Sequence, residues 1–376
     1  MRDVLNTQNQ RLLRGLQDLS AMIDQATIPT ELGPYRVLIQ DFCQQYVRRT
    51  EQNLYDLQLG QDMILEDILS NTQGANRIAT LLSTRWAIPI LRASDTDRLS
   101  LRIIGWMHQA HPLTATLPPA FTDGATSVWT APVPIYFLPC IERLGFLYQP
   151  LLFHEFGHLL YRLRKPEMDA LVGELQREIA RCLMPPSRRN DRHSDEQARQ
   201  RQVIVDTWYA WAQEIFCDAI GLAIGGPSFL LAFSTHLSMM ERGDFYQSPA
   251  DLRGSSHPVT WLRVQLLAER AQKLGLSDLA QHILNEWTII AKAMGIQEDY
   301  HGYFNVEISN EVRRIVDDML VEADPRWYLP EEIVDTEWSA DSDSIVHLLN
   351  RAWQIYRTDP AYYPQWEKEA LNRFLA

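Results

Sequence analysis

Apolar residues recur at helical spacing through most of this chain. Residues 3–26 carry them about every third or fourth position, which predicts an amphipathic helix. Residues 27–34 contain Pro29, Gly33 and Pro34 and break the pattern, and a second amphipathic stretch follows. We expect residues 1–75 to form a helical hairpin or bundle. Such a region can be a packing layer over a catalytic core or a regulatory arm that binds a partner.

The stretch from residue 124 to 138 has a different character. Its β-branched and aromatic residues favour a strand. Proline cannot donate a ladder hydrogen bond, so Pro132, Pro134 and Pro139 predict a strand at the edge of a small sheet. An edge strand can pair with an extended peptide, or proline can simply blunt it against aggregation. The sequence alone leaves both interpretations open.

The C-terminal part returns to helical periodicity. Its predicted helices cover residues 261–274, 277–294, 306–321 and 342–357. The last of them carries one apolar stripe, made of Val346, Leu349, Trp353 and Tyr356. Such a stripe is a core face or a docking face for a partner. These patterns together predict a predominantly helical α+β protein.

Composition and charge narrow the function. The formal net charge of the 376 residues is 35 − 48 = −13, which argues against sequence-independent nucleic-acid binding and against docking on anionic membranes. The four cysteines include no short-spaced pair, so we expect buried reduced thiols. The N-terminus has no apolar core of signal-peptide type, and the run of low polarity at 219–233 is too short to span a bilayer. We therefore expect a soluble, cytoplasmic protein without a membrane span.

The candidate chemistry centres on residues 154–158, which read His-Glu-Phe-Gly-His. On a helix, His154 and His158 lie on one face about one turn apart, so both imidazoles can reach one metal ion. Glu155 points to a neighbouring angle, where it can touch a metal-bound water without ligating. We expect this helix to begin near Tyr148, with Pro150 tolerated in its first turn.

A second predicted helix carries Glu214 and Asp218, four residues apart on an otherwise apolar segment. Buried carboxylates are costly unless they are paired or bound to a metal. An acidic pair on such a helix therefore needs a cation, and the upstream His-Glu-x-x-His helix gives a reason for one. The alternative is a partly exposed helix with mildly repelling acidic neighbours. Cys217, between these carboxylates, is interpreted as a buried thiol.

The two motifs together resemble the gluzincin arrangement of zinc metallopeptidases. The resemblance implies His154, His158 and Glu214 as zinc ligands, with Glu155 as the catalytic base. Asp218 matches the aspartate that orients the first ligand histidine. The gap of 214 − 158 = 56 residues is similar to that in the CAAX-prenyl-protease and HtpX-like peptidase family. The segment His257-Pro258…Arg263 resembles that family's downstream His-Pro-x-x-x-x-Arg segment.

The resemblance implies a fold and an activity. The fold is a zincin (minigluzincin-like) core with helical additions at both ends: residues 1–90, a catalytic domain over 91–300 and an extension over 301–376, packed as one compact unit. The activity is that of a zinc-dependent endopeptidase acting on a protein or peptide substrate, with Zn²⁺ as its cofactor. His257 is the first candidate for the donor that holds the oxyanion, with Arg263 and Tyr209 behind it. Family members are usually membrane-embedded, so this chain resembles a soluble relative.

Two other functions fit the same motifs. One is a catalytically inactive zincin-fold protein that binds a regulatory partner through its terminal helices, although an intact Glu155 counts against it. The other is a zinc hydrolase of a non-peptide amide. A substrate-length cleft beside the 124–138 strand would favour the peptidase, and a small closed pocket would favour the amide hydrolase.

Overall fold

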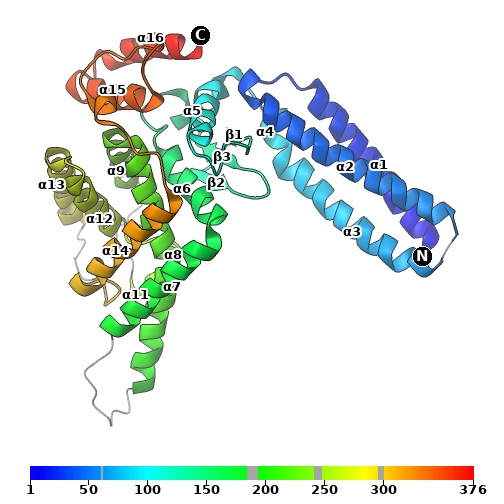
Figure 1. Ribbon diagram of the computed structural model, residues 1–376, viewed down its shortest axis with the longest axis horizontal. Helices are drawn as coiled ribbons and strands as arrows, with labels where there is room; N and C mark the ends of the chain where they lie inside the picture. The colour runs from blue at the N-terminus through cyan, green and yellow to red at the C-terminus, as the bar shows by residue number, and fades with distance from the viewer. Residues whose placement is uncertain (61, 184–193, 241–247, 295–299) are drawn as a thin grey trace. The chain divides into compact units, whose positions relative to one another are not determined.

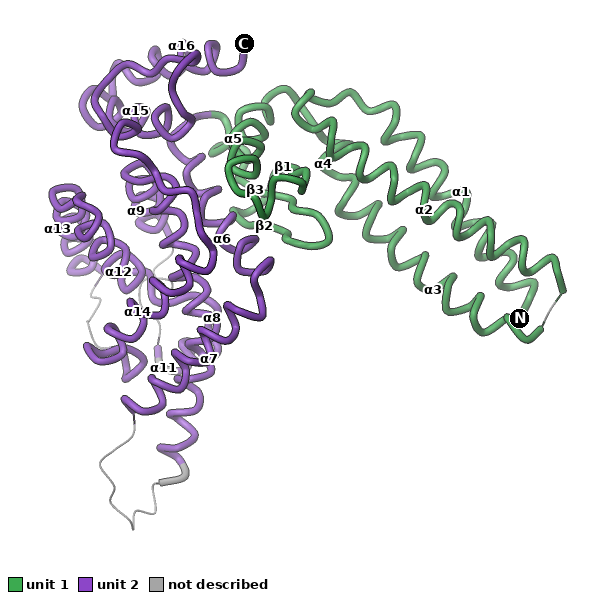
Figure 2. The backbone as a smooth tube through the Cα atoms, in the orientation of Figure 1, with its two compact units in different colours: residues 1–144 green, residues 145–376 purple. Residues whose placement is uncertain are grey.

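The computed structural model describes residues 1–376 except 61, 184–193, 241–247 and 295–299. Helices dominate it and one small sheet accompanies them, which confirms a predominantly helical α+β protein. The chain divides into two compact units, residues 1–144 and 145–376 (Figure 2). The finer division at residues 90 and 300 stays a prediction. Among the described residues, none of the helices combines the length and apolar character needed to cross a bilayer.

The first unit opens with three long helices: α1 (Arg2–Gln25), α2 (Gly33–Gln58) and α3 (Leu65–Leu81). They lie side by side (Figure 1), and buried apolar residues at helical spacing, such as Leu16, Ile23 and Ile39, fill the space between them. The helical bundle predicted for the N-terminal region is therefore present. Short 3₁₀ turns at Thr30–Leu32 and Asp62–Ile64 connect the helices.

A buried polar layer crosses this bundle. The Asn9 side chain on α1 donates a hydrogen bond to Thr72 Oγ1 on α3 at 2.8 Å, and Asn53 on α2 donates to Asn9 Oδ1 at 3.1 Å. All three side chains are at most 5% exposed. Because a buried amide without partners is costly, this layer fixes how the three helices align along their axes.

Shorter elements complete the first unit. A π-helical turn (Leu82–Trp86) leads into α4 (Ile88–Leu91), and a 3₁₀ turn (Asp95–Asp97) into α5 (Arg98–Gln109). The strands β1 (Ala120–Asp123), β2 (Ser127–Trp129) and β3 (Ile135–Leu138) follow, and a 3₁₀ turn (Glu142–Leu144) ends the unit. Arg143 closes this part of the chain by pairing with Asp97 at 2.5 Å and with Asp123 at 2.9 Å.

The sheet corrects the sequence-based expectation of an edge strand over 124–138. That range forms two strands, and the longer, β3, is the central one: it pairs in parallel with β1 and antiparallel with β2. The prolines do not prevent this, because Pro132, Pro134 and Pro139 all lie outside Ile135–Leu138 and remove no ladder donor. Pro134 even accepts a hydrogen bond from the Ala120 amide at 2.9 Å.

The second unit is built around α8 (Ser194–Gly225). The helices that pack against it are α6 (Leu151–Leu163), α7 (Lys165–Cys182), α9 (Pro227–Ser238), α12 (Thr260–Lys273), α14 (Val306–Ala323) and α15 (Ile345–Thr358). The short α11 (Pro249–Leu252), α13 (Ser277–Met294), a 3₁₀ turn (Pro330–Ile333) and α16 (Tyr363–Leu375) complete it. Trp208, Trp211 and Phe216 on α8 are fully buried and form much of the core.

Candidate metal centre

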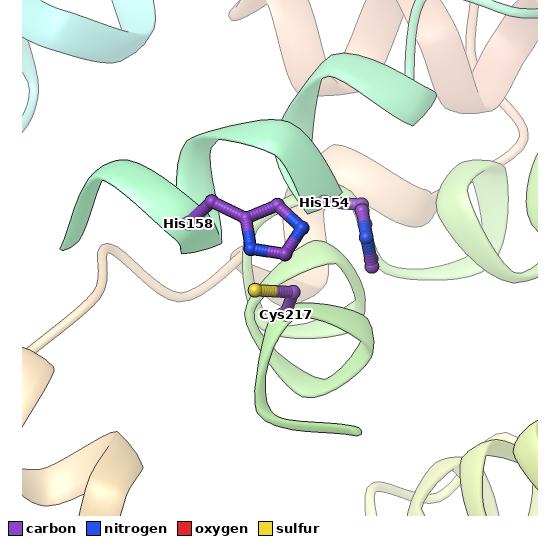
Figure 3. A group of neighbouring side chains, drawn as sticks. All are labelled: His154, His158 and Cys217. Carbon is purple, nitrogen blue, oxygen red and sulfur yellow. The ribbon is translucent and has the colours of Figure 1, made fainter. Parts of the chain in front are cut away.

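Helix α6 carries the two histidines and the glutamate between them. It begins after Pro150, near the position predicted from the sequence, and ends at Leu163. His154 and Glu155 are each 7% exposed. The rings of His154 and His158 lie 5.0 Å apart between centroids, on the same side of the helix (Figure 3). The pattern therefore places two imidazoles on one face of α6, with His154 buried and His158 partly exposed.

Two glycines let α8 approach α6 closely enough to add its own side chains. A Cβ atom on Gly157 of α6 would lie 2.8 Å from the Cα of Cys217 on α8. Farther along, a Cβ atom on Gly225 of α8 would lie 2.8 Å from the ring of Phe153 on α6. A larger residue at position 157 would have to displace the backbone of α8, and one at position 225 would have to displace the ring of Phe153. The glycine inside the His-Glu-x-x-His motif thus sets the distance between the two helices.

Glu214 reaches both histidines from α8. Its Oε2 lies 3.4 Å from His154 Nε2, and its Oε1 lies 3.5 Å from His158 Nε2. Ligand atoms at about 2.0–2.1 Å from a tetrahedral zinc ion lie roughly 3.3–3.4 Å from each other. Glu214 Oε2 is buried and accepts no hydrogen bond of good geometry from the described residues, although Arg263 Nη2 lies at ion-pair distance, 3.2 Å, from it. The spacing of the nitrogens and oxygens fits a cation held by His154, His158 and Glu214.

Asp218 lies one turn farther along α8 and touches the other side of His154. His154 Nδ1 is 2.9 Å from Asp218 Oδ1, so this carboxylate can hold Nδ1 as the protonated nitrogen and leave Nε2 facing Glu214. The ring of His154 also stacks on Phe233 of α9, with centroids 5.7 Å apart and planes at 20°. The imidazole is therefore fixed by a carboxylate at its edge and an aromatic ring on its face.

Arg263 of α12 joins the site through the carboxylates. Its Nε donates to Asp218 Oδ2 at 2.9 Å and its Nη2 to Asp218 Oδ1 at 2.7 Å, while Nη2 also lies 3.2 Å from Glu214 Oε2. Its guanidinium lies 4.9 Å from the centre of the Phe233 ring. Arg263 is only 6% exposed. In this position it supports the two carboxylates, whereas the sequence made it a candidate for contacting the reacting group.

The pKa values of the site follow burial and these partners. Burial alone would lower the pKa of His154, but Asp218 and Glu214 raise it to about 10. Burial dominates at His158 and lowers its pKa to about 4. Burial would raise the pKa of Glu214, but His154 and Arg263 hold it well below its usual range. A proton on His154 thus balances the buried carboxylates in this structure, a role that a divalent cation can take.

Glu155 differs from the other carboxylates. Its burial raises its pKa to about 7, opposed by His154 and Arg263. A carboxyl group with a pKa near neutrality can both accept and donate a proton under ordinary conditions. This property suits a general base and is unsuited to a permanent anionic ligand. The surroundings of Glu155 and Glu214 therefore shift their pKa values in opposite directions.

Cys217 is a second candidate for the third ligand, one that the sequence had assigned to the core. One ligand atom each of His154, His158 and Cys217 lie within 4.8 Å of one another (Figure 3). Glu214 fits better, because its oxygens lie at 3.4–3.5 Å from the imidazole nitrogens. Burial also raises the pKa of the Cys217 thiol well above its usual value, as do Glu214 and Asp218, which disfavours the thiolate that a metal requires.

Two candidate residues remain, His257 and Tyr209. His257 precedes α12 with its side chain 58% exposed, and its Nε2 is 3.6 Å from Glu214 Oε2. The Ser256 hydroxyl lies 2.8 Å from His257 Nδ1. Tyr209 is engaged elsewhere: its hydroxyl donates to Asp169 Oδ1 at 2.9 Å and accepts from Lys165 Nζ at 3.0 Å. Sequence reasoning missed Phe233, because an aromatic residue on the apolar α9 looks like any core residue.

Comparison of this chain with protein-family models, with curated proteins and with solved structures finds no match.

Proposed function

We propose that this protein is a zinc-dependent endopeptidase with a gluzincin-type site, similar to a soluble member of the CAAX-prenyl-protease and HtpX-like family. The observation that supports it most is the position of Glu214, whose two oxygens lie 3.4 and 3.5 Å from the Nε2 atoms of His154 and His158. Two imidazoles and one carboxylate are a ligand set of catalytic zinc sites, which keep a further position open.

Within this proposal each residue has one task. Zinc bound by His154, His158 and Glu214 would supply a Lewis acid and lower the pKa of water towards neutrality. Glu155 accepts the proton of the attacking water and returns it to the leaving amine, which its pKa of about 7 allows. Asp218 keeps the Nε2 atom of His154 directed at the centre.

Two further residues have tasks in this proposal: His257 contacts the substrate, and Arg263 supports the carboxylates of the site. The imidazole of His257 is exposed and near Glu214, so it can donate a hydrogen bond to the oxyanion that forms from the substrate carbonyl. Arg263 holds Asp218 and Glu214 in place and does not contact the substrate. The zincin core of this proposal consists of α6 and α8 with the buried start of α12 beside them. The substrate class is a protein or peptide.

Metal analysis and proteolysis of matched variants test the proposal. Wild-type protein should contain about one zinc ion per chain, Glu214→Ala should lose it, and Cys217→Ala should keep it. Glu155→Gln should retain zinc but lose peptidase activity by about a hundredfold or more, measured on a quenched fluorescent peptide library. If Glu214→Ala kept its full zinc content and Cys217→Ala lost its zinc, the third ligand would be Cys217 and not Glu214. Undiminished activity in Glu155→Gln would refute the mechanism.

A further inference from the structure

A groove runs between α1 and α3 in the first unit. Its volume is about 640 Å³. Leu12, Leu16 and Leu69 form its floor, and polar side chains such as Gln73 and Asn76 form its rim. The lining spans eleven residue steps from Gln8 to Leu19 on α1, which corresponds to roughly 17 Å at 1.5 Å per residue. That length matches about three turns of another helix.

The groove is held open by the fold. Thr72, which lines it, accepts the hydrogen bond from Asn9, and Asn9 in turn accepts one from Asn53. This buried polar layer joins α1, α2 and α3, so α1 and α3 cannot slide along each other to close the space without breaking hydrogen bonds. A groove that is already formed costs little reorganisation when it binds a partner.

The charge that lines the groove is positive. Among the described residues that line it, Arg11 is the one charged side chain, and the carboxylates of Asp18, Glu66 and Asp67 lie outside it. A neighbouring depression on α1 is lined by Arg11 and Arg14 together with Thr7 and Gln10. Within the described part of the chain, neither arginine has a carboxylate at ion-pair distance. In a chain of net charge −13, two such arginines beside an apolar floor are complementary to an acidic ligand.

Gly15 adds an independent observation. It lies in the middle of α1 and lines the groove, yet a Cβ atom placed on it would meet nothing within 4 Å. Glycine inside a helix is less stable than alanine by roughly 0.5–1 kcal/mol, and Gly74 on α3, outside the groove, shares this open position, so what distinguishes Gly15 is its place in the groove lining. A helix that packs against α1 at this position could come closer to its backbone than any larger side chain would permit.

We propose that the groove between α1 and α3 binds an amphipathic helix of a partner protein that carries acidic side chains beside its apolar stripe. The partner's apolar residues contact Leu12, Leu16 and Leu69, its carboxylates pair with Arg11 and Arg14, and its backbone passes close to Gly15. Such binding adds a fourth helix to the bundle, in the helix-in-groove manner. The inference concerns the first unit alone and does not depend on the proposed peptidase activity.

Binding of synthetic helices to the full-length protein tests this. Two fluorescein-labelled peptides of about 16 residues share one leucine stripe; one has glutamates flanking the stripe and the other has lysines. Fluorescence anisotropy then measures both against wild type, Arg11→Glu, Gly15→Leu and Gly74→Leu. Gly15→Leu fills the groove, while Gly74→Leu is its matched control, because Gly74 also faces open space on α3 but does not line the groove.

The glutamate peptide should bind wild type and Gly74→Leu equally, and Gly15→Leu about tenfold or more weakly. Arg11→Glu should weaken the glutamate peptide by about two- to fivefold and strengthen the lysine peptide. Equal binding of the glutamate peptide to Gly15→Leu, or a preference of wild type for the lysine peptide, would overturn the proposal. So would a wild-type dimer that Gly15→Leu dissociates in sedimentation, since the occupant would then be a second copy of this chain.

Discussion

Arg263 and Asp218 form a bidentate ion pair, with hydrogen bonds of 2.9 and 2.7 Å, inside the second unit. The side chains are 7% and 3% exposed. Because the same aspartate touches His154 Nδ1, the arginine acts on the metal ligands through an intermediate carboxylate. A charge this deeply buried is tolerated only because its partners are complete.

Replacement of Arg263 should therefore destabilise the protein strongly. Arg263→Met removes the guanidinium that pairs with Asp218 and lies beside Glu214, at a cost of about 3–5 kcal/mol in the free energy of unfolding. Arg263→Lys should be intermediate, because one ammonium cannot make the two parallel hydrogen bonds. Urea unfolding followed by circular dichroism measures both.

The matched control is Arg313→Met. Arg313 also donates two hydrogen bonds to a carboxylate, both to Glu269 Oε2 at 2.9 and 2.6 Å, but both side chains are about one-third exposed or more. Its loss should cost less than about 1 kcal/mol. If the two variants lost similar amounts of free energy of unfolding, burial would not make the Arg263 pair more important for stability than the exposed Arg313 pair.

Gly157→Ala should damage the metal centre despite the higher helix propensity of alanine. The added methyl group would lie 2.8 Å from the Cα of Cys217, so α6 and α8 must separate, at a cost of about 1–3 kcal/mol. Zinc affinity should fall at the same time, because Glu214 on α8 moves away from the histidines. Isothermal titration with zinc and thermal unfolding measure the two effects.

Gly74→Ala provides the comparison, since a Cβ atom there meets nothing within 4 Å. It should stabilise the chain by about 0.5–1 kcal/mol. If Gly157→Ala behaves in the same way, the close approach of α6 and α8 is not required.

His108 should make the first unit less stable at acidic pH. Its Nδ1 lies 3.0 Å from the Leu117 carbonyl and its Nε2 lies 2.9 Å from the Tyr136 hydroxyl, so Nδ1 donates and Nε2 accepts in a neutral ring. Burial lowers its pKa to about 4 from 6.5. Below pH 6.5 the unfolded chain binds a proton that the folded chain does not, so stability is complete above pH 6.5 and declines as the pH falls towards 4.

Hydrogen exchange of the α5 amides between pH 7 and 4, corrected for intrinsic rates, follows this loss. His108→Gln should be less stable at neutral pH and show a flatter pH dependence. His282→Gln, at a half-exposed position, should keep the wild-type slope. An unchanged slope in His108→Gln would assign the acid sensitivity to other groups.

The buried layer of Asn9, Asn53 and Thr72 should tolerate complete replacement better than partial replacement. Asn9→Leu alone removes the acceptor of the Asn53 amide and the donor to Thr72, whose hydroxyl keeps its hydrogen bond to the Ile68 carbonyl, and should cost about 1–3 kcal/mol. Changing all three to apolar residues of similar size should recover much of that loss, while allowing the helices alternative alignments. Urea unfolding and the line widths of NMR amide signals distinguish the two results; a triple variant less stable than Asn9→Leu would contradict this.

Much of the candidate site was accessible from the sequence, because it depends on spacing within single helices. His154 with His158, and Glu214 with Asp218, are each four residues apart, and the helices that carry them are present. That the two helices meet was indicated by the need of the acidic pair for a cation and by the family resemblance. The ion pair between Arg263 and Asp218, the contact of Gly157 with Cys217 and the stacking of Phe233 depend on tertiary packing, which no local pattern encodes.

The position of β3 in the sheet and the N-terminal groove also depend on tertiary packing that local sequence patterns do not encode. Proline near β3 predicted an edge position, but the outcome depended on whether the prolines fell inside the paired residues, a matter of one or two positions. Asn9, Asn53 and Thr72 are ordinary surface-type residues in the sequence. Their burial follows from the way three helices align, and the groove beside them follows from the same alignment.

The contact between Gly157 and Cys217 also carries an evolutionary consequence. The two positions share one fixed volume, because the space that a side chain at 157 would need is filled by the backbone and thiol of 217. Among descendants of this sequence, position 157 is confined to glycine for as long as the two helices keep their separation, whereas position 217 can vary only among small residues. A lineage that enlarges either one has to give up the geometry of the centre.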